Sequence, residues 1–464
     1  MQTEDTLIIG AGPAGLAAAH ELIRLGLTPH VIEGLSRPGG LSRTEEHAGY
    51  RFDLGGHRFL TQMPEIGRLW EEMLGPDLLT VHRQSRIYYG GRFFRYPLQA
   101  WDTFARLGPV ETARILASYV QTRLSPPDGD DTFEEWVTRR FGARLYETFF
   151  KTYTEKVWGM PCSELRADWA AQRIKGLSLV TAVINALGLG SRAKTLSDHF
   201  LYPRLGPGMM WERFADQVVT AGGQVSLHSR VLELVRTGSR IDHLVVQNSG
   251  GQQTLPCPRL ISSMPLDELV MSLKPSPPAE VQAAAQRLRH RAFVIVQVAI
   301  DRPSLFPYHW IYVHDPSVIV GRIQNFGNWS AELLPDPCKS SLGLEYFCSE
   351  GDEIWSLSNA ELIDLAGREL HALGLADPAW IEDATAVRHP KAYPIYDETY
   401  RQSVETIRAY LRGIENLQTI GRSGMHRYNN LDHSMMTGIL AARNLVGEQH
   451  DLWEINADHE EEFE

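Results

Sequence analysis

Short apolar runs and helical periodicity follow one another at the N-terminus of the chain. Residues 6–9, Thr-Leu-Ile-Ile, form an apolar run that predicts a buried strand of a parallel sheet. Residues 16–25 are rich in alanine and leucine and predict a helix, and residues 28–33 predict a second strand. This order of strand, helix and strand indicates a βαβ unit.

Longer helical and strand-like blocks occupy the rest of the chain. Helical periodicity covers about residues 100–193, with amphipathic helices predicted at 134–150 and 177–187. Strands are expected at 223–235 and from 293 to about 347, and further helices at 359–373 and 434–446. No internal repeat or long linker separates these blocks, so later segments must complete the sheet that the first unit begins.

Composition limits the class of protein and its partners. The chain has 464 residues, 43% of them hydrophobic, which is enough for a large core in two or three domains. Its net charge of −12 gives no global electrostatic support for binding nucleic acid or an anionic membrane. No apolar run reaches the roughly 18 residues that a membrane span needs. Four cysteines without a CxxC pair or metal-like spacing favour a cytoplasmic protein with free thiols and no metal.

A glycine motif lies between the first strand and the first helix. Gly10, Gly12 and Gly15 have the spacing GxGxxG, which permits a tight turn, backbone approach to a pyrophosphate and close packing of helix on strand. The free N–H groups at the helix N-terminus favour an anion. Glu33 ends the second strand and can accept hydrogen bonds from ribose hydroxyls. The pattern predicts a dinucleotide site; a glycine-rich turn without a ligand is the alternative.

Further glycine segments favour FAD over NAD as the dinucleotide. Residues 37–44, Arg-Pro-Gly-Gly-Leu-Ser-Arg-Thr, resemble the loop of glutathione-reductase-type flavoproteins that contacts the pyrophosphate and approaches the flavin. The resemblance implies cofactor contacts for Gly40 and Arg43, with a plain surface arginine as the alternative for Arg43. The next glycine pair would bring Gly56 against the isoalloxazine and His57 near its reactive face.

The expected fold class is α/β, with a discontinuous Rossmann-type FAD-binding domain, an inserted helical domain and an antiparallel β-sheet substrate domain. The expected ranges are 1–75, 204–285 and 412–450 for the FAD-binding domain, 100–203 for the helical domain, 76–99 and 286–411 for the substrate domain, and 451–464 for an acidic tail. In related flavoproteins a residue at the position of Val231 contacts adenine through its backbone.

Two segments outside the glycine motifs carry a more specific resemblance. Residues 149–165, Phe-Phe-Lys-Thr-Tyr-Thr-Glu-Lys-Val-Trp-Gly-Met-Pro-Cys-Ser-Glu-Leu, resemble the helical-domain signature of UDP-galactopyranose mutases. Residues 421–432, Gly-Arg-Ser-Gly-Met-His-Arg-Tyr-Asn-Asn-Leu-Asp, are similar to the C-terminal flavin and phosphate segment of that family. Segments 309–312, 321–330 and 393–396 also resemble the family and follow in its order.

This resemblance implies a reaction and a set of site residues. In the family, N5 of reduced FAD attacks the anomeric carbon of a nucleotide sugar, and the isomerisation has no net redox change. NADPH or NADH is a candidate reductant, and permanently charged guanidinium groups suit a diphosphate leaving group. The implied catalytic residues are His57, Arg173 and Arg322; the implied substrate-binding residues are Tyr153, Trp158, Asn328, Tyr393, Arg422 and Tyr428; Gly421, Arg422 and Asp432 are implied to contact the cofactor.

Several of these roles have structural alternatives. Arg173 could form an ion pair on a helix surface, Trp158 and Tyr153 could be core aromatics, and Tyr393 could only hold a strand turn. Asn430 replaces the aspartate that the mutases carry, and no counterpart of the uracil-binding segment is found. These departures put the base and the sugar in question more than the fold.

A second function class shares the same FAD domain. Amine oxidases, protoporphyrinogen oxidase and carotenoid desaturases have it, so an FAD-dependent oxidoreductase is the alternative function. A pocket for apolar substrates would need aliphatic and aromatic lining but no converging arginines. Arginines together with tyrosines therefore favour a nucleotide sugar as the small-molecule partner. A non-catalytic FAD-binding protein is a third hypothesis.

Overall fold

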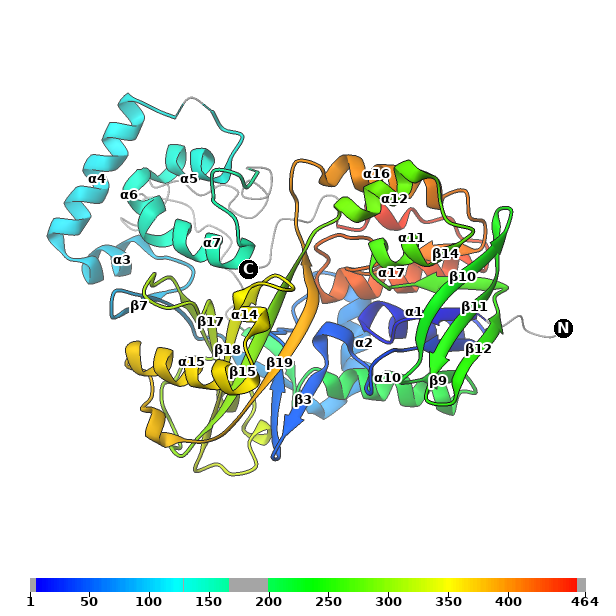
Figure 1. The fold of residues 1–464 in the computed structure, drawn as a ribbon. Helices are drawn as coiled ribbons and strands as arrows, with labels where there is room; N and C mark the ends of the chain where they lie inside the picture. The colour runs from blue at the N-terminus through cyan, green and yellow to red at the C-terminus, as the bar shows by residue number, and fades with distance from the viewer. Residues whose placement is uncertain (1–5, 128, 167–198, 457–464) are drawn as a thin grey trace.

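A five-stranded parallel sheet forms the centre of one lobe. The computed structural model describes residues 6–127, 129–166 and 199–456, and this lobe lies on the right in Figure 1. The strands, in spatial order, are β20 (Leu417–Thr419), β13 (Arg259–Ser262), β1 (Thr6–Ile9), β2 (Pro29–Ile32) and β9 (Gln224–Ser226). They come from three distant parts of the chain, so the Rossmann-type lobe is discontinuous, as the sequence predicted.

Small residues let helices pack tightly on this sheet. The helices of the lobe are α1 (Pro13–Arg24), α2 (Pro64–Leu74), α10 (Gly208–Thr220) and α17 (Leu431–Asn444). α1 packs against α17 at Gly438, where a Cβ would lie only 2.1 Å from the carbonyl oxygen of Ala14. α17 is therefore held against α1, which brings the segment before α17 close to the glycine motif.

A smaller sheet and three helices complete the lobe. The strands, in spatial order, are β12 (Gly251–Pro256), β11 (Arg240–Asn248), β10 (Arg230–Thr237) and β14 (Leu273–Lys274). The helices are α11 (Leu266–Ser272), α12 (Ala279–Arg287) and α16 (Tyr400–Leu411). Their leucines, valines and isoleucines share one core with the outer face of the parallel sheet.

The second lobe is built on a seven-stranded sheet. The strands, in spatial order, are β19 (Ile381–Pro394), β15 (His290–Ile300), β18 (Ser340–Cys348), β17 (Arg322–Asn325), β16 (Trp310–Val313), β6 (Ser85–Tyr89) and β7 (Arg92–Arg95). All neighbours are antiparallel except β16 and β6, which pair in parallel. The mixed α/β fold that the sequence predicted is thus confirmed, with one parallel pair in the second sheet.

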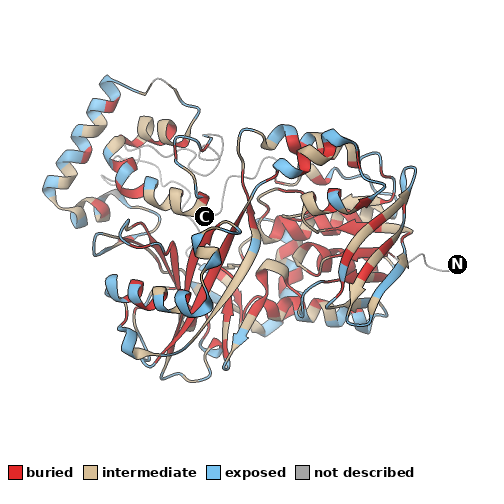
Figure 2. Ribbon diagram, viewed as in Figure 1, coloured by how far each residue is buried: buried red, intermediate tan, exposed pale blue. Residues whose placement is uncertain are grey.

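Side chains of the central strands point alternately to the two faces of this sheet, and each face packs against a different core. In β15, Val294 and Val296 pack with α15 (Asn359–Ala372), whereas Phe293 and Ile295 face the opposite core. Because successive side chains of a strand point to opposite faces, the odd-numbered positions of β15 and β18 share the face away from α15. Figure 2 shows the central strands buried between the two layers. Every polar side chain on this inner face must therefore be hydrogen-bonded or functional.

A helical lobe covers the inner face of the sheet. Its elements are α3 (Ala100–Leu107), α4 (Pro109–Leu124), α5 (Phe133–Phe141), α6 (Ala143–Tyr146), a π-helical stretch (Glu147–Lys151) and α7 (Thr152–Trp158). The single helix predicted at 134–150 is wrong, because the chain breaks at Gly142, whose φ is 85°. A capping box between Thr132 and Glu135 begins α5. The helix predicted at 177–187 lies outside the described residues.

Several short elements complete the described fold. These are the hairpin β3 (Thr44–His47) and β4 (Tyr50–Asp53), the antiparallel pair β5 (Leu78–His82) and β8 (His199–Pro203), and the helices α13 (Phe326–Trp329) and α14 (Glu353–Ser356). All four cysteines are free thiols. Within the described ranges, no helix has both the length and the apolar character needed to cross a bilayer. The same ranges contain no group of three or more His, Cys, Asp or Glu residues that could hold a metal ion.

Candidate active site

Backbone geometry at the start of α1 fits a dinucleotide pyrophosphate. Gly10 has a φ of 98°, and a Cβ there would lie 2.2 Å from Ser263 Oγ. A Cβ on Gly15 would lie 1.9 Å from the carbonyl oxygen of Gly10, so only glycine lets the helix approach the end of the strand. Gly12 precedes α1, whose first turn has no side-chain cap and no acidic residue. Its N–H groups are thus available to an anion such as the pyrophosphate of FAD.

A second glycine loop lies directly against the first. Gly39 and Gly40 have φ values of 112° and 55°, and a Cβ on Gly40 would lie 3.3 Å from Gly12 Cα. The N–H of Gly39 donates to the carbonyl of Ala11 at 2.8 Å. The two loops therefore form one backbone cradle, in which side chains are excluded and the main chain can contact a flat or anionic group.

Two buried charged side chains brace this cradle. Glu33 Oε2 accepts the N–H of Ala11 at 2.7 Å, and the carboxylate keeps further lone pairs for ribose hydroxyls. Arg43 donates from Nη1 to the carbonyl of Gly40 at 2.9 Å and from Nε to Glu45 at 2.5 Å. Arg43 is only 8% exposed, which excludes the alternative of a plain surface arginine. Its guanidinium shapes the loop that the sequence implied would contact FAD.

The remaining sequence-predicted cofactor residues lie on three separate elements. Gly421, with a φ of 77°, approaches the first turn of α1, where a Cβ on Gly421 would lie 2.9 Å from Ala14 Cβ. Asp432 is buried and accepts the hydroxyl of Thr61 at 2.9 Å. Val231 is a largely buried residue of β10. Gly421 thus joins the cradle itself, and the roles of Asp432 and Val231 stay predictions.

The close approach at Gly15 can be tested by adding one methyl group. Gly15→Ala should weaken FAD binding about tenfold, because the Cβ meets backbone that cannot move aside and forcing space into a packed site costs on the order of 1–3 kcal/mol. Flavin absorbance after titration of the apoprotein measures the affinity. Gly34→Ala is the matched control, because a Cβ there meets nothing within 4 Å. Equal affinity for both variants would contradict the cradle.

A buried ion pair stands on the inner face of the seven-stranded sheet. β17 and β18 pair with Arg322 opposite Glu345, and Arg322 Nη2 lies 2.7 Å from Glu345 Oε2. Arg322 also donates to the hydroxyl of Tyr393 at 2.7 Å, and Gln324 Nε2 donates to Glu345 Oε1 at 2.7 Å. The Arg322 guanidinium lies 4.7 Å from the ring centroid of Phe347. Arg322 is thus oriented on several sides, and its charge is compensated by a carboxylate.

Arg422 has a different electrostatic setting beside two stacked tyrosines. The rings of Tyr393 and Tyr428 are 5.8 Å apart and nearly parallel, at 18°. The guanidinium of Arg422 lies 4.4 Å from the Tyr428 centroid, and its Nε donates to the carbonyl of Asn429 at 2.9 Å. Among the described residues no carboxylate is paired with Arg422. The site therefore carries one positive charge that is available to an anionic ligand.

His57 lies near both arginines and near Glu345. A Cβ on the preceding Gly55 would lie 3.8 Å from His57 Cε1 and 3.9 Å from Glu345 Oε2. Burial, together with the positive charges of Arg422 and Arg322, lowers the pKa of His57 to about 3. A neutral imidazole can accept or donate a hydrogen bond, so His57 suits a proton-sharing role at neutral pH.

The ring of Trp310 leaves no room for a side chain at Gly56. A Cβ on Gly56 would fall 1.4 Å from Cζ3 of the Trp310 ring, so the loop before His57 is pressed onto β16. The indole N–H of Trp310 is buried and has no acceptor among the described residues. Gly56 is therefore explained by this packing, and the orphaned N–H is a donor that a bound cofactor or substrate could use.

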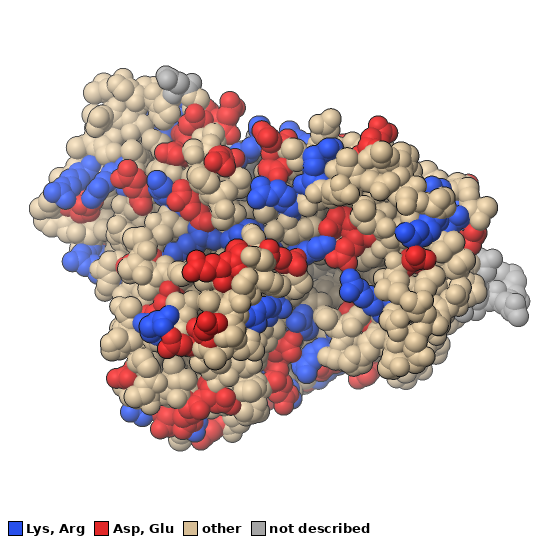
Figure 3. Space-filling view, viewed as in Figure 1, with Lys and Arg blue, Asp and Glu red and all other residues tan. Residues whose placement is uncertain are grey.

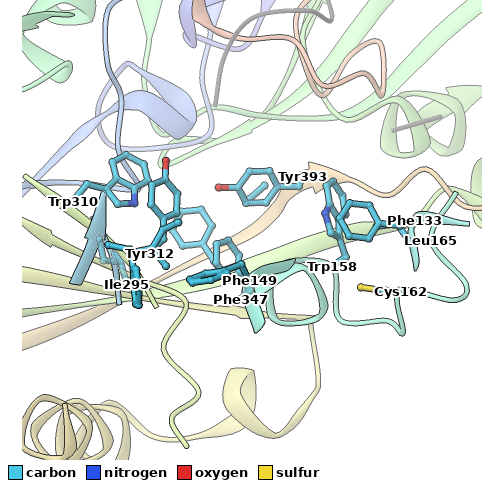
Figure 4. Close-up of a cluster of buried hydrophobic side chains, with 14 of the residues drawn as sticks. Phe133, Phe149, Trp158, Cys162, Leu165, Ile295, Trp310, Tyr312, Phe347 and Tyr393 are labelled. Atoms are coloured by element: carbon cyan, nitrogen blue, oxygen red, sulfur yellow. The ribbon is translucent and has the colours of Figure 1, made fainter. Parts of the chain in front are cut away.

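Trp158 and Tyr153 come to the site from α7. Figure 4 shows Tyr393 between Trp310 and Tyr312 on one side and Trp158 on the other. Trp158 is 4% exposed and belongs to the same buried cluster as Tyr393. The ring of Tyr153 is stacked on His314, with centroids 4.8 Å apart and planes at 8°. Tyr153 thus fastens α7 to β16 and to the loop after it, and Trp158 lies in the buried cluster that contains Tyr393.

The buried His314 predicts a dependence of stability on pH. Burial, with the nearby charge of Lys156, lowers the pKa of His314 to about 3 from its usual 6.5. Between these values the unfolded chain binds a proton that the folded protein does not, so stability falls as the pH is lowered from 6.5 toward 3. His314→Phe should reduce this slope by up to about 1.4 kcal/mol per pH unit. Urea unfolding at pH 4–7 measures the slope, and an unchanged slope would contradict the assignment.

Two sequence-predicted residues are not placed at the site. Asn328 donates its amide to the carbonyls of Phe306 at 3.0 Å and Tyr308 at 2.9 Å, which ties α13 to the loop before β16. Both donors of Asn328 therefore serve the backbone, and the implied substrate contact of this residue stays a prediction. Arg173 lies outside the described residues.

Glu345 is the main residue that sequence reasoning missed. It is a single carboxylate in the otherwise apolar run Leu-Gly-Leu-Glu-Tyr-Phe of β18, and it has no exposed surface. A lone charge inside a strand of this kind is a signal that could have identified it, because charged residues are almost never fully buried unless paired.

Figure 3 shows Lys and Arg side chains at the margin of a hollow between the two lobes.

Comparisons with known proteins agree on a flavoprotein fold. A family model described as flavin containing amine oxidoreductase matches residues 13–446. A solved structure of reduced UDP-galactopyranose mutase has a TM-score of 0.84 at 23% identity and covers 98% of both chains. At this identity the likeness shows the fold, and the α/β architecture expected from the sequence is confirmed.

Curated relatives include both function classes considered from the sequence. The chain is 28% identical over 175 residues to a probable UDP-galactopyranose mutase of Klebsiella pneumoniae, covering 36% of this chain and 44% of that protein. It is 21% identical over 450 residues to chloroplastic protoporphyrinogen oxidase of Nicotiana tabacum, covering 89% of this chain and 80% of that protein. The match thus spans less than half of the mutase relative.

Proposed function

Since the chain belongs to the family of flavin containing amine oxidoreductases, we propose that this flavoenzyme acts as a nucleotide-sugar mutase. It would bind a nucleoside-diphosphate sugar beside FAD and isomerise the sugar ring without net oxidation or reduction. Arg422 carries the proposal, because its guanidinium lies over the rings of Tyr393 and Tyr428 and has no carboxylate partner among the described residues.

Each residue of the site has a separate role in the proposed reaction. When bound in its reduced form, FAD supplies the nucleophilic electron pair for the anomeric carbon of the sugar. Arg422 binds the diphosphate, and Arg322 orients the hydroxyl of Tyr393 toward the same space. Neutral His57 exchanges hydrogen bonds with sugar hydroxyls, and Trp158 closes the site against water. NADPH or NADH would reduce the flavin before the first turnover.

An FAD-dependent oxidoreductase is the second candidate, and one observation favours it. Glu345 neutralises Arg322, and the Arg322 guanidinium lies against the rings of Trp310 and Phe347, which share a buried cluster with Tyr312. A site with one uncompensated arginine and this aromatic lining could also hold a mainly apolar substrate with a single acidic group. The two functions differ in whether oxygen or another electron acceptor is consumed.

Anaerobic turnover distinguishes the two candidates. Protein reduced with dithionite is incubated with UDP-, GDP- and TDP-sugars, and the products are separated by chromatography, with oxidised protein as the control. A ring-isomerised sugar formed only by the reduced protein would support the mutase and identify its substrate. No turnover and no binding of any nucleotide sugar would refute it, and hydrogen peroxide formation with amine or apolar substrates would then support the oxidoreductase.

A further inference from the structure

Exposed apolar side chains gather on the helical lobe, away from the active site. The described residues expose ten large apolar side chains, and five of these lie on α3 and α4: Trp101, Val110, Leu116, Val120 and Leu124. Trp101 is 76% exposed and Leu124 is 80% exposed. Single exposed apolar residues are ordinary, but a contiguous group marks an interaction surface.

The exposed residues of α4 form a continuous stripe. Val110, Ala113, Ala117, Val120 and Leu124 recur at steps of three or four, and all five are exposed. These steps place the five side chains within one third of the helix circumference. The buried side of α4 is instead formed by residues such as Ile115 and Thr122. Figure 2 shows the outer side of α4 as largely exposed. The helix thus has an apolar face that the described chain does not cover.

The surroundings of this stripe are basic, in contrast to the chain as a whole. Residues 92–124 contain five arginines and two carboxylates, whereas the net charge of the chain is −12. Both carboxylates are engaged within the lobe: Asp102 accepts Arg106 Nε at 2.8 Å, and Glu111 accepts Arg144 Nε at 2.6 Å.

Two of these five arginines border the stripe itself. At about 100° per residue, Arg114 and Arg123 fall on the two opposite edges of the apolar stripe. Arg123 is exposed; its Nε donates to the hydroxyl of Tyr119, and its guanidinium lies over the Tyr119 ring. The pattern is an apolar strip with an arginine on each side, of which Arg114 also lies 3.4 Å from Glu111.

We propose that the α3–α4 hairpin docks this protein onto an anionic lipid surface. An amphipathic helix of this pattern lies in the plane of a membrane, with its apolar stripe among the acyl chains and its arginines at the lipid phosphates. Trp101, at the start of α3, would sit at the boundary between headgroups and acyl chains.

Charge complementarity favours lipid over a second copy of the chain. A twofold pairing of α4 with itself would bring the same arginine-bearing edges together. The two carboxylates of residues 92–124 already pair with arginines of their own lobe, Asp102 with Arg106 and Glu111 with Arg144 and Arg114, so neither is available across such a pairing. Anionic headgroups supply the opposite charge along both edges. The overall charge of −12 acts weakly at this site, because screening limits its reach to about 8–10 Å at physiological salt.

Vesicle binding by the full-length flavoprotein tests the proposal. Vesicles of phosphatidylcholine with one third phosphatidylglycerol, and vesicles of phosphatidylcholine alone, are sedimented with the protein. The stripe variant carries Val110→Gln, Val120→Gln and Leu124→Gln. The matched control carries Val219→Gln, Met271→Gln and Val446→Gln, three other exposed apolar positions. Circular dichroism establishes that both variants are folded.

The expected result is binding to the anionic vesicles that the stripe variant loses by at least tenfold and the control variant keeps. Binding should also weaken with added salt and with Arg114→Gln/Arg123→Gln. No vesicle binding, or equal binding by the stripe variant, would overturn the proposal. A wild-type dimer in light scattering that binds no vesicles and becomes monomeric in the stripe variant would also overturn it, and would identify a second copy as the partner.

Discussion

Arg322→Ala should lower the free energy of unfolding by about 3–5 kcal/mol, the range found when one partner of a buried ion pair is removed. The reason is Glu345, a carboxylate with no exposed surface, which would lose the guanidinium that lies 2.7 Å away. Gln324 would remain as its hydrogen-bond donor, but an amide does not neutralise a charge. Urea unfolding followed by circular dichroism measures the change.

A double substitution separates the ion pair from the volume of the side chain. Arg322→Met with Glu345→Gln removes both charges and keeps most of the packing, so it should recover most of the lost stability. If Arg322→Ala alone changes the free energy of unfolding by less than about 1 kcal/mol, Glu345 is not held by this ion pair. The pair therefore gives Arg322 a positioning role in addition to any contact with substrate.

Arg422→Ala should weaken the binding of a diphosphate ligand about tenfold to a hundredfold, because a charged hydrogen bond contributes about 1.5–3 kcal/mol. Its stability should change little, since Arg422 is half-buried and has no carboxylate partner in the described part of the chain. Calorimetric titration of the oxidised flavoprotein with UDP measures the affinity. The resemblance implied a catalytic role for Arg322 and a binding role for Arg422. The structure adds that Arg322 is paired with a carboxylate, whereas Arg422 has none among the described residues.

A matched charge change controls for long-range electrostatics. Arg412→Ala removes the same charge at the exposed end of α16 and should leave the affinity for UDP unchanged. The loss in Arg422→Ala should also shrink as salt is added, since the interaction with the diphosphate is partly screened. Unchanged affinity in Arg422→Ala would remove the observation on which the mutase proposal rests.

The cofactor-binding elements could be predicted from the sequence, because they depend on short-range patterns. The strand Thr6–Ile9, the glycine spacing and the acidic end of β2 depend on neighbours within about twenty residues, so motif and periodicity were sufficient. The break at Gly142 escaped the periodicity, because the apolar pattern continues through a residue whose φ of 85° ends the helix.

Tertiary structure decided which side chains meet. Register places Arg322 opposite Glu345, and the packing of α17 on α1 brings Arg422 and Tyr428 to Tyr393. These partners are 23 to 35 residues from one another along the chain, and no local pattern encodes such pairings. The sequence by itself determined which residue types were available to the site. Only the fold determined which arginine was neutralised and which was free for an anion, because the distance between charges is a property of the packed chain.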